Sequence, residues 1–183
     1  MALQAFWRFT DTESSPSPDV RYAELSRKSS KATGRTLVHR TISIKDNFRA
    51  ALPFVVRKFF DSNGASSTDQ PPCISVNEYV SEDRASCSLV VHSVSESYGT
   101  LVTEHRELRP HPSRADVTVY IQQGQVGAAD SCSVFRKPVR ATAHRFARDS
   151  MLAQMKLFAA FIASMYPGAV WSITAGGSDD DSI

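Results

Sequence analysis

The residues of this sequence that could do chemistry lie in two stretches. In the first, His105 and His111 flank a turn with acidic side chains nearby. Imidazole and carboxylate groups are ordinary ligands of Zn²⁺. The alternating pattern here is more typical of solvated side chains at a strand end, and Glu104, His105 and Arg106 are interpreted as positions on a half-exposed strand. We therefore predict no metal site.

No arrangement of residues for catalysis stands out. The sequence contains no Gly-x-Ser-x-Gly, no His-Glu-x-x-His, no glycine-rich phosphate loop and no Cys-x-x-Cys. Cys73, Cys87 and Cys132 share no metal-type spacing, and their odd number does not suggest a disulfide framework. We predict no catalytic residues, no cofactor and a function other than catalysis.

The second stretch is basic and runs from Arg136 to Arg148. One interpretation is a solvated helix face. The other is attraction to the anionic headgroups of a membrane, for which the predicted membrane-facing residues are Arg136, Lys137, Arg140 and Arg145. Nucleic acid is disfavoured because the formal net charge is only +2 and the cations are not interleaved with exposed aromatic residues.

The basic stretch opens a long helix predicted over Val139–Tyr166, with Pro138 in its first turn. The apolar part, Met151–Tyr166, contains Gln154 and Lys156 and is shorter than the ~20 residues that cross a bilayer. A core helix is therefore predicted. Small and aromatic residues recur at three- and four-residue steps along one face: Val139, Ala143, Phe146, Ser150, Ala153, Leu157, Ala160, Phe161 and Ser164.

The rest of the chain predicts an antiparallel sheet with helices. A short helix is expected at Ala2–Phe9, and a second at Phe48–Phe60, capped by Asp46 or Asn47 despite Pro53. Gly124–Ser133 is expected to be a linker. Strands are expected at Val20–Arg27, Arg35–Ile44, Ile74–Val80, Ser86–Val94, Thr100–Leu108 and Ala115–Gln123.

These elements predict an α+β domain in which a curved antiparallel sheet wraps around the long C-terminal helix and leaves an internal cavity. With 183 residues, one domain is expected, over residues 1–166, with a flexible tail at 167–183. The N-terminus has no basic segment followed by an apolar run, so it does not read as a secretory signal. Composition alone leaves the compartment open.

Several segments, in order, resemble those of one protein family. They are AFWRF at Ala5–Phe9, the hairpin sequence DVRYAELSRKSSKATGRTLVHRTISI, the segment LVTEHRELRPHPSRADVTVYIQQGQVG, and Phe146 followed by Asp149 in the long helix. From Ala5 to about Ala163 the chain resembles the PRELI (slowmo-like) domain of mitochondrial phospholipid-transfer proteins.

The resemblance implies a helix-grip, START-like fold, in which the curved sheet and the long helix enclose one phospholipid. It also implies transfer of phosphatidic acid or phosphatidylserine between membranes in the mitochondrial intermembrane space. The implied partners are the phospholipid, an anionic membrane surface and a small helical-hairpin protein with twin cysteine motifs. The first edge strand of the family domain has no counterpart before Ala2.

Carried over residue by residue, the resemblance implies headgroup contacts at Arg8, Lys45, Asp149 and Lys156. The implied cavity lining is Phe48, Val55, Phe146, Ala153 and Leu157. Two departures bear on these residues: Phe9–Thr12 replaces the family's Tyr-Pro-Asn-Pro, and Leu152 stands at a lysine position. The alternative is a divergent helix-grip protein that binds another apolar ligand or serves as a protein-interaction module.

Overall fold

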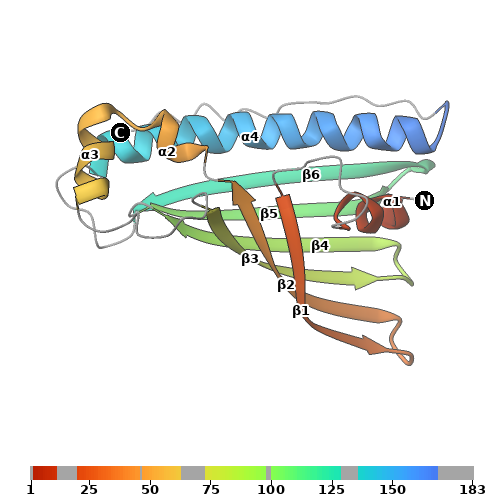
Figure 1. The fold of residues 1–183 in the computed structure, drawn as a ribbon. Coiled ribbons are helices and arrows are strands. Elements are labelled where there is room, and N and C mark those ends of the chain that lie inside the picture. Colours follow the sequence, from red (N-terminus) through yellow and green to blue (C-terminus); the bar gives the residue numbers. More distant parts are fainter. Residues whose placement is uncertain are drawn as a thin grey trace.

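A computed structural model describes residues 2–11, 20–45, 47–62, 73–97, 100–128 and 136–168, with the side chains of residues 59–62, 115, 128 and 136 left aside. Cys132 and the expected tail from residue 169 onward lie outside the described residues. Within them the architecture is α+β: one six-stranded sheet with helices on one side (Figure 1).

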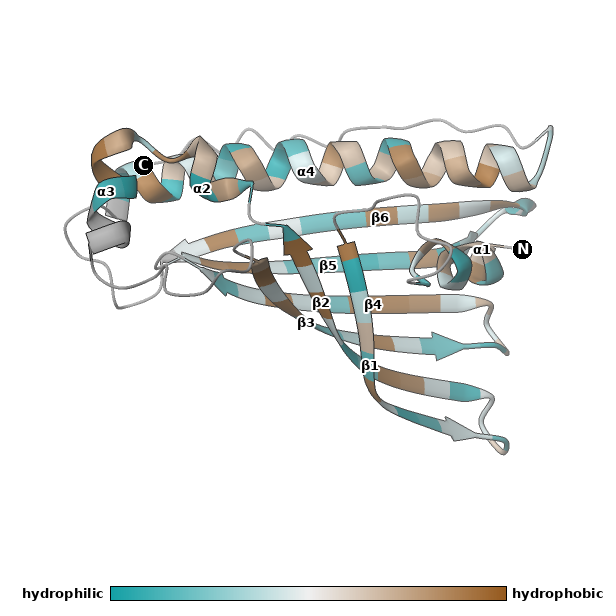
Figure 2. Ribbon diagram, viewed as in Figure 1, coloured by the Kyte–Doolittle hydropathy of each residue, from teal (hydrophilic) through white to brown (hydrophobic). Residues whose placement is uncertain are grey.

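The sheet is an antiparallel meander in which each strand pairs with the next along the chain, in the order β1-β2-β3-β4-β5-β6. Apolar and polar residues alternate along the strands (Figure 2), as expected for a sheet with one covered face. The strands are β1 Val20–Ser30, β2 Arg35–Lys45, β3 Cys73–Asp83, β4 Ser88–Ser97, β5 Thr100–His111 and β6 Arg114–Ala128. All six predicted strands are confirmed, and most are longer than expected.

The helices lie at the two ends of the sheet and along one edge. The long helix α4 (Arg136–Met165) runs along β6, with Pro138 in its first turn as predicted. Helix α1 (Ala2–Phe9) packs near the C-terminal end of α4, while α2 (Phe48–Ala51) packs near its N-terminal end (Figure 1).

The single helix predicted over Phe48–Phe60 is wrong, because the structure divides it at Pro53 into α2 and α3 (Phe54–Ser62). Leu52 has ψ of 145°, the extended conformation that a following proline imposes. Asn47 occupies the N-cap of α2, although its side chain makes no capping hydrogen bond there. The break turns part of the expected buried face outward.

The linker predicted over Gly124–Ser133 is also wrong in its first half. Strand β6 continues to Ala128 and pairs with β5 along this stretch, from Glu104 opposite Gly124 to Thr100 opposite Ala128. Small residues weaken strand propensity, but hydrogen bonding to an existing neighbour strand outweighs that preference. A Cβ on Gly124 would lie 3.0 Å from Met151 Sδ, so this glycine lets α4 approach the sheet closely.

The core consists of two apolar clusters at opposite ends of the helix-facing side of the sheet. The first joins α1 and the C-terminal half of α4 to the sheet through Ala5, Phe6, Val38, Val80, Leu89, Val91, Leu108, Phe158 and Ile162. The second joins α2, α3 and the N-terminal half of α4 to the other end of the sheet through Phe48, Leu52, Val56, Val126, Val139 and Ala143. Between these clusters the same face of the sheet is polar.

The stripe of small and aromatic residues predicted to face the core is buried only in the first half of α4. Val139 and Ala143 are buried, but farther along the buried residues are Phe158 and Ile162, while Leu157 is exposed. A stripe of constant 3.6-residue period stays on one side of a straight helix, whereas the strand beneath it twists. The contact face therefore moves around the helix toward its C-terminus.

The architecture is compatible with a helix-grip-like fold, because an open antiparallel sheet accompanies a long C-terminal helix. The internal cavity predicted between them is not shown by the described residues. None of the described helices combines the length and the apolar character that crossing a bilayer requires.

Candidate functional site

A buried polar cluster occupies the middle of the helix-facing side of the sheet. Arg40, Glu78, Ser93 and Arg106 come from β2, β3, β4 and β5, and all four are buried. Each is two residues along its strand from a member of the first apolar cluster, so it points to the same face. We call these four residues the charged cluster.

Glu78 is the centre of the charged cluster and is fully buried. Its carboxylate accepts hydrogen bonds from Arg40 Nε and Arg106 Nη2, and from Ser93 Oγ at 3.3 Å. Arg106 Nη2 also donates to Ser93 Oγ at 2.9 Å. One carboxylate thus pairs with and orients two guanidinium groups from different strands, so each buried charge has an opposite charge in contact with it.

Aromatic rings surround the Arg40 guanidinium. Its central carbon lies 4.6 Å from the ring centroid of Tyr22, 5.7 Å from that of Phe6 and 5.6 Å from that of Trp7. Arg40 Nη1 donates to Thr10 Oγ1 at 2.9 Å. Phe6, Trp7 and Thr10 belong to α1 and the residue that follows it, so Arg40 connects α1 to the sheet through cation–π contacts and a hydrogen bond.

A second carboxylate extends the charged cluster toward β6. Glu104 Oε2 lies 3.5 Å from Arg106 Nε, and Glu104 Oε1 accepts a hydrogen bond from Gln122 Nε2. Tyr120 donates its hydroxyl hydrogen to Gln122 Oε1 at 3.1 Å. Glu104, His105 and Arg106, interpreted as positions on a half-exposed strand, lie on β5, where Arg106 is buried on the covered face.

Burial and charge act in opposite directions on the pKa of Arg106. Burial alone would lower it, but the carboxylates of Glu78 and Glu104 outweigh burial and raise the pKa well above its ordinary value. Burial also raises the pKa of the phenols of Tyr22 and Tyr120. The two phenols are therefore neutral hydrogen-bond donors, and Arg106 stays a cation.

This chemistry suits electrostatic recognition and structural anchoring. Two arginines and two carboxylates balance each other in charge, and a guanidinium does not become deprotonated at neutral pH. An anion that reached this region would meet cations already held by Glu78. The charged cluster therefore provides a strong local field without a proton donor and acceptor pair of the kind acid–base catalysis uses.

The four residues expected to contact a headgroup do not come together. Arg8 is on the exposed face of α1, and Lys45 is the last residue of β2. Asp149 and Lys156 are exposed on α4, where Asp149 Oδ1 lies 3.7 Å from Arg148 Nε. Their positions follow from helix and strand phase, since each is on the side of its element away from the core.

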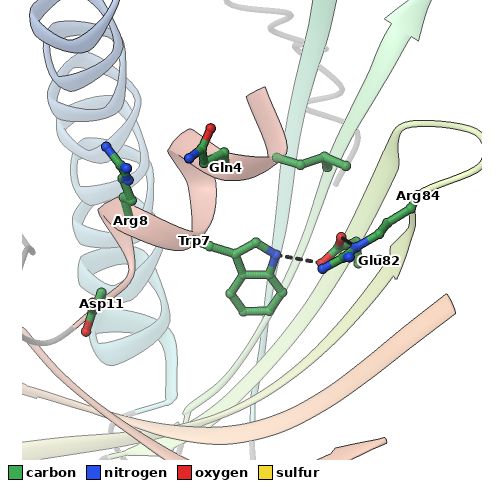
Figure 3. A pocket seen from close by; sticks show the side chains of 7 residues that line it. Gln4, Trp7, Arg8, Asp11, Glu82 and Arg84 are labelled. Carbon is green, nitrogen blue, oxygen red and sulfur yellow. Dashed lines mark hydrogen bonds and ion pairs between the residues drawn. The ribbon is translucent and has the colours of Figure 1, made fainter. Parts of the chain in front are cut away.

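Arg8 borders an open hollow of about 500 Å³ between α1 and the turn after β3. Trp7 Nε1 donates to Glu82 Oε2 at 2.7 Å, and Arg84 Nε donates to Glu82 Oε1 at 2.9 Å. Figure 3 shows Trp7 pointing toward Glu82 while Arg8 points away from it. The hollow contains none of the other three predicted headgroup residues.

Of the residues predicted to line the cavity, Phe48 and Phe146 pack against each other, with ring centroids 5.4 Å apart. Val55 is 65% exposed and Leu157 is 42% exposed, and Ala153 also lies on the surface. These three residues do not line an interior space. The break at Pro53 turns Val55 outward, and the drift of the contact face along α4 leaves Ala153 and Leu157 in solvent.

Three of the predicted membrane-facing residues, Lys137, Arg140 and Arg145, are exposed on α4. The side chain of Arg136 lies outside the described residues. Arg145 also borders a smaller hollow of about 250 Å³ with His144 and Arg148. Among the residues that the structure describes, no group of three or more histidine, cysteine or acidic side chains is arranged to hold a metal ion.

A sequence signal for the charged cluster existed. In β2 the alternation Val38, Arg40, Ile42 places a charged residue in phase with two buried apolar residues. In β3 Glu78 is likewise in phase with the buried Val80. A charge at a core-facing position of an alternating strand predicts a buried ion pair, but its partner on another strand is set by sheet register.

No protein-family model matches this chain, and no curated protein matches its sequence.

Proposed function

We propose that this protein binds a phospholipid and transfers it between membranes, with phosphatidic acid and phosphatidylserine as candidate cargoes. The observation that carries the proposal is the order of the elements: a short helix, a hairpin, a helical segment, a four-stranded meander and one long helix along the sheet edge. Apart from the family's first edge strand, this is the order that the resemblance to the PRELI domain implies. No covalent step is part of the proposal.

The end of the molecule formed by α3 and the start of α4 has the character of a membrane contact. Phe54 and Val55 project from α3 with 63% and 65% of their surface exposed. Lys58 Nζ lies 5.4 Å from the Phe54 ring centroid, and Lys137 and Arg140 are exposed at the start of α4. Apolar side chains enter the interface between headgroups and acyl chains, and each nearby cation adds about 1 kcal/mol on an anionic surface.

The proposed setting is the mitochondrial intermembrane space, with a small helical-hairpin protein as partner. The alternative is a protein-interaction module or a carrier of another apolar ligand. The observation that favours the alternative is the charged cluster itself, whose arginines are already paired with Glu78 on the face that would enclose a headgroup.

The decisive experiment is transfer of labelled phosphatidic acid and phosphatidylserine from donor to acceptor liposomes, with and without a hairpin partner, together with mass spectrometry of copurifying lipids. The double variant Phe54→Ser, Val55→Ser should reduce transfer at least tenfold while the fold is retained. Leu25→Ser is the matched control, because Leu25 is similarly exposed on β1. Arg8→Ala and Lys45→Ala test the implied headgroup contacts.

A folded preparation that neither transfers these lipids nor carries bound lipid, with the partner present, would refute the proposal and favour the interaction module. Transfer that survives the Phe54 and Val55 substitutions would place the membrane contact elsewhere.

A further inference from the structure

The face of the sheet away from α4 carries a row of ring side chains. His39, Tyr79, His92 and His105 lie directly opposite one another on β2, β3, β4 and β5. The rings of His39 and Tyr79 stack with centroids 4.5 Å apart and planes inclined by 7°. The charged cluster lies on the other face, so this row is independent of it.

His92 and His105 end this row as a pair of imidazoles, of which His92 is exposed and His105 is partly buried. Their ring centroids are 4.7 Å apart and their planes are inclined by 45°. The two Nδ1 atoms face each other at 3.4 Å. This separation is longer than the ~2.7–3.2 Å typical of a hydrogen bond, so the direct interaction between the rings is weak.

The same separation matches one edge of a metal coordination tetrahedron. Zn²⁺ binds imidazole nitrogen at about 2.0–2.1 Å, which places two tetrahedral nitrogen ligands about 3.3–3.4 Å apart. Two adjacent ligands in a square-planar site would be about 2.8–2.9 Å apart, so the pair fits Zn²⁺ better than Cu²⁺.

We propose that His92 and His105 form a two-histidine site for one Zn²⁺ ion on the outer face of the sheet. Both ligands bind through Nδ1, and water fills the two remaining positions. Both residues belong to directly paired strands, so the sheet holds the two side chains opposite each other before the metal arrives. The neighbouring carboxylate of Glu107 is engaged with Arg109, whose Nε lies 3.1 Å from Glu107 Oε1.

The test is titration of the 183-residue chain with Zn²⁺ alone, by isothermal titration calorimetry at one fixed pH, because metal affinity depends on pH. One ion should bind per chain, and His92→Gln or His105→Gln should each weaken binding at least tenfold. Co²⁺ as a second probe should give the intense visible absorption of tetrahedral coordination. His111→Gln and His144→Gln are controls, since these histidines lie at the end of β5 and on α4.

Three outcomes would overturn the proposal. They are the absence of saturable binding up to about 1 mM Zn²⁺, binding that persists in the His92→Gln, His105→Gln double variant, and an equal loss in the His144→Gln control. Far-ultraviolet circular dichroism of each variant separates loss of the site from loss of the fold. A rise in melting temperature with Zn²⁺, present in the wild type and absent in the double variant, would support it.

Discussion

Replacing Glu78 by glutamine should destabilise the protein more than any other single change of charge in the sheet. The substitution keeps the shape of the side chain but removes the negative charge that faces Arg40 and Arg106. It also turns an amide NH₂ group toward guanidinium donors where an oxygen now accepts. Arg106 keeps Glu104 at 3.5 Å, whereas no other described carboxylate is paired with Arg40.

The expected magnitude follows from burial. Removing one partner of a buried ion pair costs about 3–5 kcal/mol, because the remaining charge has neither water nor a counter-ion. Total stabilities of domains are about 5–15 kcal/mol, so the loss is a large fraction of the whole. With a dependence on urea of about 2 kcal/mol per molar, the unfolding midpoint should fall by about 1.5–2.5 M.

The assay is equilibrium unfolding in urea, followed by circular dichroism and by tryptophan fluorescence. Glu107→Gln is the matched control, because Glu107 lies on the opposite face of the sheet in a partly exposed pair with Arg109. Exposed pairs contribute about 0–1 kcal/mol, so its midpoint should hardly change.

A Glu78→Gln protein within about 1 kcal/mol of wild type would refute this reasoning, because a buried charge would then have been left uncompensated at almost no cost. A second variant tests whether the loss comes from leaving Arg40 and Arg106 without the carboxylate of Glu78. The triple substitution Arg40→Met, Glu78→Leu, Arg106→Met removes all three charges together, and it should be more stable than Glu78→Gln alone.

Two further predictions concern the hairpin turns. The pKa of Asp83 is lowered by hydrogen bonds from the backbone N–H groups of Ser86 and Ala85. Its stabilising contribution is therefore present above its ordinary value of 3.8 and is lost as the pH falls through the lower folded-state pKa. Asp83→Asn should therefore reduce the fall of the urea unfolding midpoint as the pH is lowered below 3.8. The same fall in the variant and in the wild type would contradict this prediction. Gly34 has φ of 67° in the turn between β1 and β2. Gly34→Ala should lower the free energy of unfolding, measured by thermal unfolding, by about 1–2 kcal/mol, and Gly34→Asn should lower it by less. Equal stability of the wild type and the two variants would contradict this prediction.

Local sequence was enough to predict the elements of this fold. The alternation in Arg35–Ile44 and in the four later strands predicted a meander, because side chains of a strand point to opposite faces in turn. Pro138 marked the first turn of the long helix, and Gly168, which follows its last turn, has φ of 98°, a conformation that glycine adopts readily. Of the two misplaced boundaries, the extension of β6 to Ala128 lies where tertiary pairing competes with local preference, whereas the division of the second helix at Pro53 is a local effect of proline.

The candidate sites depended on the tertiary structure. Arg40, Glu78 and Arg106 are separated by 38 and 28 residues, and only the register of β2, β3, β4 and β5 brings them into one cluster. The pair of His92 and His105 likewise arises from direct opposition of two strands. A one-residue change of register would turn either set to the opposite face.

The amino-acid sequence by itself determined which residues form strands and helices, and which side of each strand is apolar, because these follow from steric preference and periodicity within a few residues. The tertiary structure decided which charges meet, which part of α4 is buried, and that Val55, Ala153 and Leu157 face solvent. The physical reason is that the relative orientation of the elements depends on sheet twist, strand register and the break at Pro53. The periodicity of residues within one helix or strand gives no information about that orientation.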